Sequence, residues 1–306
     1  MRAGIRRCRW AGADQGVTPR WKRRRRVRRY LGGVDVEPGE LVDGAAAVSD
    51  PESDKYWALI RRLHDRTDRA AFDVALTAAR STEIRRRLVG LDVLGQIGYA
   101  ADRPFRAETL AALLAEAVQA ADDRLIASAV TALGHLSDPR ARPGILRHAA
   151  HPSKDVRFAV AVALPGVTDA DAPDADVVEA LIRLTRDPDT QVRDWATFGL
   201  GTQLAADTPA VRAALTERLG DPDGDTAGEA LLGLARRHDP RALPRVLAWL
   251  DDDPGNLIVE AAGELAAPEC LPALLRLKDR DGGGDNAWSA GLDAAIAACA
   301  PTRPAG

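Results

Sequence analysis

The chain has 306 residues, of which 46% are hydrophobic and only 4% are aromatic. This apolar content excludes an intrinsically disordered protein, and the predominance of alanine favours closely packed helices over a β-sandwich or barrel. The net charge of −3 conceals an asymmetry, since residues 1–30 hold 12 basic and one acidic side chain and the remainder holds 30 basic and 44 acidic ones. We therefore expect an all-α, acidic body behind a basic N-terminal segment.

The basic N-terminal segment contains the run RWKRRRRVRRY at residues 20–30. One interpretation is an arginine-rich arm that binds nucleic-acid phosphates without sequence preference. The other is that arginine reflects a coding bias and that translation starts downstream, near Val42 or Val48. On both interpretations residues 1–48 are predicted to be disordered, as are residues 301–306.

The cysteine pattern and the lack of long apolar segments predict a cytoplasmic protein. Cys8, Cys270 and Cys299 are widely separated and odd in number, so they form no disulfide framework and no zinc knuckle. No uncharged apolar run reaches the ~18–20 residues needed to span a bilayer. The residues after Tyr30 are interrupted by acids, glycine and proline, which is unlike a signal peptide.

From residue 49 to residue 300 the chain repeats a helix-start signal. Aspartate is a good N-cap and proline is tolerated at the first helical position, so each Asp-Pro pair predicts that a helix begins there with the aspartate as its cap. The pair recurs at residues 50/51, 138/139, 187/188, 221/222, 239/240 and 253/254. Six similar apolar helices are predicted at 88–98, 125–136, 156–167, 192–204, 226–237 and 257–266.

A second set of helices lies between the first. It is predicted at 106–121, 142–150, 176–186, 209–220, 242–250 and 270–278, with an atypical first pair at 54–64 and 68–81 and a last helix at 286–300. A leucine shared by the first set recurs at intervals of 39, 31, 36, 34 and 31 residues. Units of this length with two helices each predict a right-handed α-solenoid of about seven helical hairpins.

The best copy of the repeat carries Asp187, Pro188, Val192, Arg193, Ala196, Leu200 and Gly201. This D-P-x-x-x-V-R-x-x-A-x-x-x-L-G pattern resembles the short HEAT repeats of the phycobilisome-lyase-like type found in bacteria. The resemblance implies that the Val-Arg helix lines the concave face. It also implies an Asp–Arg ladder between repeats, to which Arg124, Arg157 and Arg193 would contribute.

The side chains opposite the apolar stripe of these inner helices form the candidate binding surface. At 100° per residue, Val192, Ala196 and Leu200 form the stripe, and Trp195 points away from it. Aligning the repeats predicts a concave lining of Phe158, Val162, Asp194, Trp195, Phe198, Glu229, Leu232, Val259 and Glu260. Tight curvature of the solenoid would instead bury Trp195 and Phe198 in the core, and the pattern leaves both alternatives open.

The function predicted from these features is a non-enzymatic scaffold that binds a protein or peptide, basic ligands included, on its concave face. No catalytic residue set, metal site or cofactor motif is found: no His-Glu pair is present, and DPDGDT at 221–226 lacks the glycine and glutamate of a calcium loop. The alternative is a nucleic-acid-associated protein using the N-terminal arm, similar to the HEAT-like alkylpurine DNA glycosylases, with Asp194 and Trp195 in the concavity. A lyase activity has no residue set to carry it.

Overall fold

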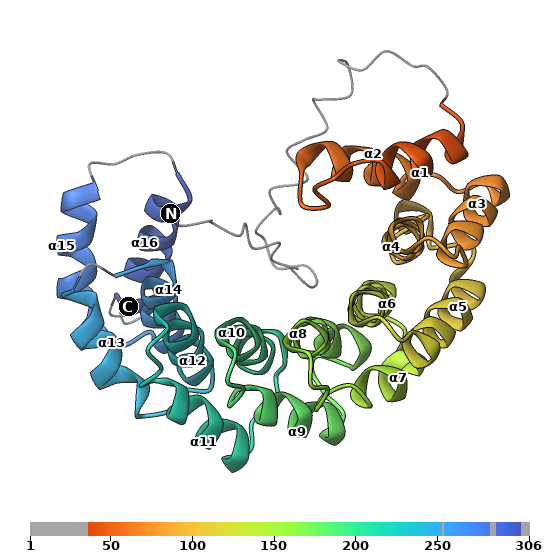
Figure 1. Ribbon diagram of the computed structural model, residues 1–306. Coiled ribbons are helices and arrows are strands. Elements are labelled where there is room, and N and C mark those ends of the chain that lie inside the picture. The colour runs from red at the N-terminus through yellow and green to blue at the C-terminus, as the bar shows by residue number, and fades with distance from the viewer. Residues whose placement is uncertain (1–35, 253, 282–285, 301–306) are drawn as a thin grey trace. The chain divides into compact units, whose positions relative to one another are not determined.

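The computed structural model describes residues 36–252, 254–281 and 286–300, and these residues contain helices and no strand. The chain divides into one unit that ends at Glu37 and a second that begins at Pro38. Within the second unit the helices form two rows that follow one another around a curve (Figure 1). The predicted all-α solenoid is therefore confirmed.

The helical elements are, in chain order, α1 (Pro38–Ala46), α2 (Asp54–His64), α3 (Arg69–Ala79), α4 (Ile84–Leu94), η2 (Tyr99–Ala101), α5 (Arg106–Gln119), α6 (Asp123–Leu136), η3 (Pro139–Ala141), α7 (Arg142–Leu146), α8 (Lys154–Ala163), η4 (Leu164–Val167), α9 (Ala175–Leu184), α10 (Thr190–Phe198), η5 (Gly199–Gln203), α11 (Pro209–Arg218), α12 (Gly224–Arg236), α13 (Ala242–Leu250), α14 (Asn256–Leu265), η6 (Pro268–Cys270), α15 (Leu271–Asp281) and α16 (Ala287–Cys299).

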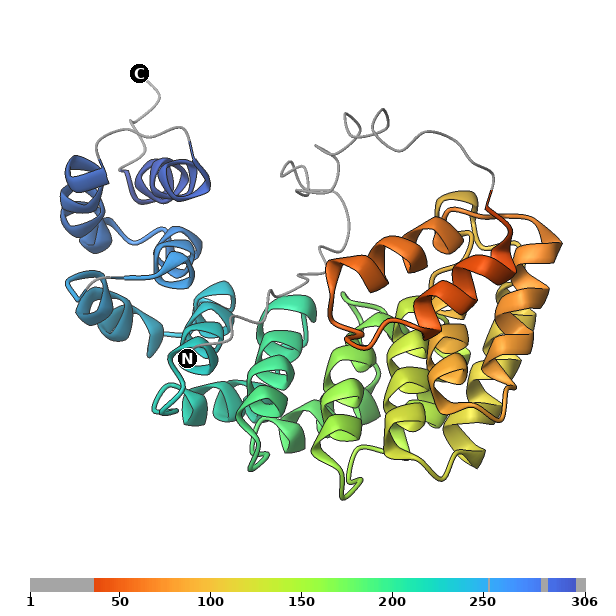
Figure 2. The ribbon, with the colours of Figure 1, turned by 45° about the horizontal axis from the view of Figure 1, so that its top comes forward.

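The inner row contains α4, α6, α8, α10, α12, α14 and α16, and the outer row contains the odd-numbered helices from α3 to α15 (Figures 1 and 2). Each inner helix packs against the inner helices before and after it and against an outer helix. Leu133, Leu164, Leu200 and Leu234, four of the leucines that set the repeat length, are all fully buried. The apolar stripe of each inner helix thus builds one continuous core.

The N-terminal boundary of the solenoid differs from the prediction. Helix α1 lies inside residues 1–48, which were expected to be disordered, and its Leu41, Val42 and Ala45 are buried. Helix α1 packs on α2, α3 and α4, which supply the apolar surface that three residues alone cannot provide. The rest of the expected disordered segment, residues 1–35, and the tail at 301–306 lie outside the described residues.

The pairing of the first helices also differs from the prediction. Helices α2 and α3 were expected to form the first hairpin, whereas α1 packs with α2, and α3 forms a regular hairpin with α4. The α3–α4 contact depends on Gly90, because a Cβ atom there would lie 2.2 Å from the backbone nitrogen of Ala79. From α3 to α16 the described residues therefore form seven hairpins.

The Asp-Pro aspartates do not cap the helices that follow them in the middle repeats. The N-cap of α10 is Asp189, which accepts hydrogen bonds from the backbone N–H groups of Gln191 and Val192, and the N-cap of α12 is Asp223. The aspartates two positions earlier, Asp187 and Asp221, bind arginines of the preceding inner helix instead. Asp187 and Asp221 thus join neighbouring repeats, where the sequence predicted that they would cap the next helix.

Two of the three arginines predicted for the ladder make these contacts. Arg157 binds the carboxylate of Asp187 through two nitrogens, at 2.6 and 2.9 Å. Arg193 binds Asp221 in the same way, at 2.9 and 3.1 Å. Arg124 binds Asp122, the N-cap of its own helix, and so does not join one repeat to the next through that carboxylate. None of the described helices is long and apolar enough to cross a membrane.

Candidate functional site

An aromatic cluster lies on the inner row at α8 and α10. Trp195 makes edge-to-face contacts with Phe158 and Phe198, at ring-centroid distances of 5.9 and 5.7 Å. Between Val192 and Gly201 only Arg193 and Trp195 retain appreciable exposure, and Arg193 is engaged with Asp221. Trp195 is therefore the main accessible side chain on this part of α10.

The two aromatic residues of α10 differ in burial. Phe198 is 9% exposed and forms part of the core, whereas Trp195 and Phe158 are half-buried. The edge-to-face arrangement is one of the preferred geometries of aromatic pairs, because the positive ring edge meets the negative ring face. Phe158 and Phe198 thus hold the indole of Trp195 in a defined orientation.

Five of the nine residues predicted to line an open face are buried, which corrects that prediction: Asp194, Phe198, Glu229, Leu232 and Val259. Glu229 and Leu232 on α12 are 1% exposed, and Val259 on α14 is 2% exposed. The reason is the close approach of the inner helices: a Cβ atom on Gly233 would lie 2.7 Å from the Cα atom of Gly201, and one on Gly228 would lie 2.9 Å from Leu257. With glycine at these positions, every residue of α12 from Thr226 to Ala235 is buried.

The acidic residues of the predicted site have different surroundings. Asp194, next to Trp195, is 9% exposed, and Glu229 accepts a hydrogen bond of 3.2 Å from the hydroxyl of Thr202. Glu260 keeps 40% of its side chain exposed and pairs with Arg236 at 2.9 Å. The carboxylates are therefore placed along the same row of helices as Trp195, from α10 to α14.

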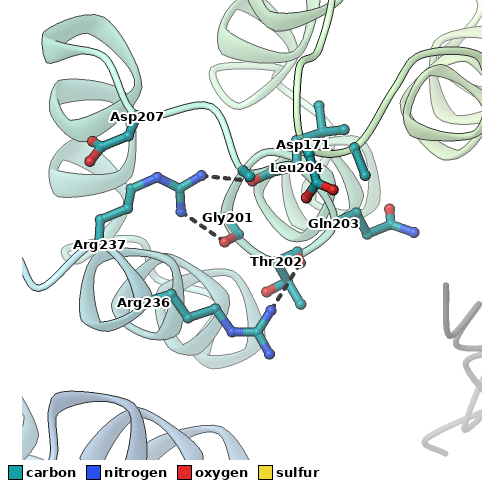
Figure 3. A pocket seen from close by; sticks show the side chains of 10 residues that line it. Asp171, Gly201, Thr202, Gln203, Leu204, Asp207, Arg236 and Arg237 are labelled. Atoms are coloured by element: carbon teal, nitrogen blue, oxygen red, sulfur yellow. Dashed lines mark hydrogen bonds between the residues drawn. The ribbon is translucent and has the colours of Figure 1, made fainter. Parts of the chain in front are cut away.

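A pocket of about 330 Å³ lies where α10 ends, beside the end of α12 (Figure 3). Its lining includes Asp171, Thr202, Gln203, Asp207, Arg236 and Arg237. The backbone widens here into a π-type turn, in which the N–H of Leu204 donates to the carbonyl of Gly199 at 3.1 Å. Such turns leave carbonyl groups without their usual helical partners.

Arg237 satisfies these carbonyl groups. Its guanidinium donates hydrogen bonds of 2.8–2.9 Å to the carbonyl oxygens of Leu200, Gly201, Leu204, Ala206 and Gly233. Two of these bonds are drawn in Figure 3. Burial lowers the pKa of Arg237 from its usual value. The residue is therefore a structural clamp between α10 and α12, and its sequence context, one of two adjacent arginines, gave no signal of this role.

A second polar cluster, also missed from the sequence, lies at the N-terminal end of the inner row. The Asp92 carboxylate on α4 accepts hydrogen bonds from the hydroxyl groups of Tyr56 on α2 and Ser128 on α6. His64 bonds to the backbone carbonyl of Asp92 at 2.9 Å. Desolvation raises the pKa of Asp92 to about 6, although both hydroxyl groups lower it.

No group of three or more potential metal ligands occurs among the residues that the structure describes. Cys270 and Cys299 are buried free thiols, and burial raises the pKa of both. The Asp194–Trp195 pair on which the glycosylase alternative depends lies on α10, where the neighbouring Arg193 and the Arg157 of α8 are both engaged by carboxylates. These two arginines therefore add little net positive charge to this stretch of the inner row.

Residues 178–267 match the model of the HEAT repeats. Protein YibA of Escherichia coli strain K12 is 34% identical over 127 residues, which make up 40% of this chain and 42% of that protein. The chain thus matches less than half the length of this curated relative.

Solved structures show the same fold over most of the chain. The X-ray structure of Escherichia coli YibA has a TM-score of 0.60 at 24% identity and covers 88% of this chain and 99% of its own. Importin beta has a TM-score of 0.51 at 14% identity, covering 85% of this chain and 41% of its own. At these identities the likeness establishes the fold alone.

Proposed function

Because this chain carries HEAT repeats and folds as an α-solenoid, we propose that its inner face binds an extended segment of another protein. The observation that carries the proposal is Trp195, a partly exposed indole on an inner helix whose other side chains from Val192 to Phe198 are buried or, at Arg193, paired. Large aromatic side chains of this kind are the residues most often found to dominate binding energy at protein interfaces. Their rings offer a large apolar area with little conformational entropy to lose.

The expected ligand is basic. Glu260 on α14, two inner helices further along the row from Trp195, keeps 40% of its side chain exposed. The chain beyond residue 30 has 44 acidic and 30 basic residues, so its overall field also favours a cationic partner. A lysine or arginine of the bound segment would lie over the face of Trp195, where the ring quadrupole attracts a cation.

Binding of labelled decapeptides to the full chain tests this proposal. One peptide alternates Lys and Arg with Leu, and the other has the same length and apolar residues with Glu in place of each basic residue. We expect the basic peptide to bind, and Trp195→Ala to weaken its binding at least tenfold. Trp249→Ala is the matched control, because Trp249 is also half-buried but lies on the outer helix α13, beside Arg245.

Two results would contradict the proposal. One is equal affinity of the wild-type chain and Trp195→Ala for the basic peptide, with both proteins shown to be folded by circular dichroism. The other is a preference for labelled duplex DNA over the peptide, with steep salt dependence and no effect of Trp195→Ala, which would favour the nucleic-acid alternative.

A further inference from the structure

The loop between α4 and α5 is unusual among the repeats. The interval from Leu94 to Leu133 is 39 residues, the longest between successive copies of the repeat leucine. The additional residues form the short helix η2, and the loop contains three left-handed residues, Gly98, Asp102 and Arg103, with φ of 67°, 59° and 52°. The ends of α6, α12 and α14 have one such residue each: Ser137, His238 and Ala266. Left-handed conformations of non-glycine residues concentrate at functional sites.

Arg103, in this loop, is a buried guanidinium without an anionic partner. It is 9% exposed, its Nη1 atom is buried and has no hydrogen-bond partner, and no carboxylate pairs with it among the described residues. The guanidinium carbon lies 5.1 Å from the centroid of the Tyr99 ring. An unpaired buried charge is costly, so proteins normally pair or solvate it.

Other buried arginines of the chain show how the free-energy cost of burying a charge is normally offset. Arg237 is also 9% exposed, and its guanidinium donates to five backbone carbonyls. Four more arginines have a buried nitrogen without a partner, and each of them binds a carboxylate through another nitrogen: Arg87, Arg142, Arg218 and Arg236. Arg103 has neither arrangement.

Two of the equivalent loops carry the opposite charge. The residue before the proline is Asp138 after α6 and Asp239 after α12, and each is bound by the arginine of a preceding outer helix, Arg106 or Arg212. Before Pro104 this position is Arg103. The loop after α4 therefore places a cation where the loops after α6 and α12 place a carboxylate.

Two histidines are linked to the loop that contains Arg103. The backbone N–H groups of Gly98 and Arg103 connect this loop to His64, because Gly98 donates to the carbonyl of His64 and Arg103 donates to that of Gly98. Gln96 bonds to His135 at 2.9 Å. Desolvation and, to a smaller extent, the charge of Arg103 lower the pKa of both imidazoles, that of His135 to about 4. No nearby carboxylate stabilises the charged form of Arg103, whose pKa is lowered by burial and then by Arg106.

We propose that Arg103 is the centre of a binding site for a small oxyanion, a carboxylate or a phosphate, held by the guanidinium beside the Tyr99 ring. The planar guanidinium matches the two oxygens of such a group. Tyr99 is 54% exposed, which leaves an aromatic surface beside the charge for the rest of the ligand. The site lies on the α4–α5 loop and is separate from the Trp195 cluster on α8 and α10.

Calorimetric titration of the full chain tests this site. The chain is titrated with inorganic phosphate and, separately, with acetate, and sodium chloride holds the ionic strength constant. We expect saturable binding of at least one anion, weakened at least tenfold by Arg103→Gln. Arg140→Gln is the control that should leave the affinity unchanged, because Arg140 is an exposed arginine already bound to Asp138. Phosphate binding alone would assign the site to phosphoryl ligands, and acetate binding alone to carboxylates; both results support the proposal.

The proposal is overturned if neither anion binds saturably to the wild-type chain, or if Arg103→Gln binds as tightly as the wild type. Should Arg103→Gln fail to fold, the NMR resonance of the Arg103 Nε–H group in the wild-type chain gives the same decision. It must shift saturably with the anion, and an unchanged resonance refutes the site. Trp195→Ala should bind the anion normally, which separates this result from that of the peptide experiment.

Discussion

The guanidinium of Arg193 on α10 donates two hydrogen bonds to the carboxylate of Asp221, 28 residues further along the chain. Both side chains are largely buried, with 12% and 2% of their side-chain surfaces exposed. The same arginine donates to the backbone carbonyls of Asp187 and Pro188. One side chain thus joins the start of its own repeat to the start of the next.

Removing one partner of this buried pair should destabilise the protein strongly. Asp221→Asn leaves the Arg193 guanidinium without its anion, and we expect the free energy of unfolding to fall by about 3 kcal/mol. Urea unfolding followed by circular dichroism measures this loss. Glu108→Gln is the control, since Glu108 binds Arg69 at the surface and its loss should cost less than about 1 kcal/mol. Equal losses in the two variants would show that the Asp221 contact adds nothing to stability.

The clamp at the end of α10 should require arginine and not merely a positive charge. Arg237→Lys keeps the charge but replaces a planar five-donor group by three donors on one nitrogen, leaving several of the five carbonyls unpaired. We expect a loss of about 3 kcal/mol in urea unfolding. Arg276→Lys, in a surface ion pair with Asp251, should change stability by less than about 1 kcal/mol. A similar effect of both substitutions would argue against the clamp.

The close approach of α10 and α12 should make Gly233 intolerant of a side chain. The Cβ atom of Gly233→Ala would lie 2.7 Å from the Cα atom of Gly201, so the helices must separate, at a cost of about 2–3 kcal/mol. Gly224→Ala, on the same helix, meets no atom within 4 Å and should be neutral or slightly stabilising. Thermal and urea unfolding of the two variants distinguish the effects. A neutral Gly233→Ala would mean that α12 is more loosely packed than its contacts indicate.

The Asp92 cluster should make stability depend on pH. Because desolvation raises the pKa of Asp92 from its usual value of 3.8 to about 6, the contribution of its protonated form is fully present below pH 3.8 and is lost as the pH rises through 6. Asp92→Asn removes this titration. The stability of the wild type relative to Asp92→Asn should therefore fall by on the order of 2 kcal/mol between pH 4 and pH 7.

Urea unfolding of both proteins at several pH values measures this difference, in which the titrations of other groups cancel. His64 and His135 lie nearby and have lowered pKa values, so they weaken both proteins alike as the pH falls. A difference between the two proteins that does not vary with pH would refute the raised pKa.

The helices and their repeat length could be predicted from the sequence because both depend on local spacing. The apolar residues of each inner helix recur at helical intervals, as at Val192, Ala196 and Leu200, and all three are buried as the spacing predicts. Arg157 and Arg193 were identified as ladder residues by their position in the repeat. Helix α1 was missed because nine residues are too few to show a helical period by themselves, and packing against α2, α3 and α4 stabilises it.

The tertiary structure decided the accessibility and the charge environment of the candidate sites. Glu229 and Leu232 are buried because Gly201 and Gly233 allow two inner helices to approach closely, and the sequence period does not specify that distance. Trp195 keeps its exposure on a neighbouring helix with the same period. Likewise, Arg237 and Arg103 follow inner helices and are equally buried, yet one meets five carbonyls and the other no anion. Burial and pairing depend on side chains some thirty residues apart in the chain, whereas helix formation depends on neighbours within a few residues.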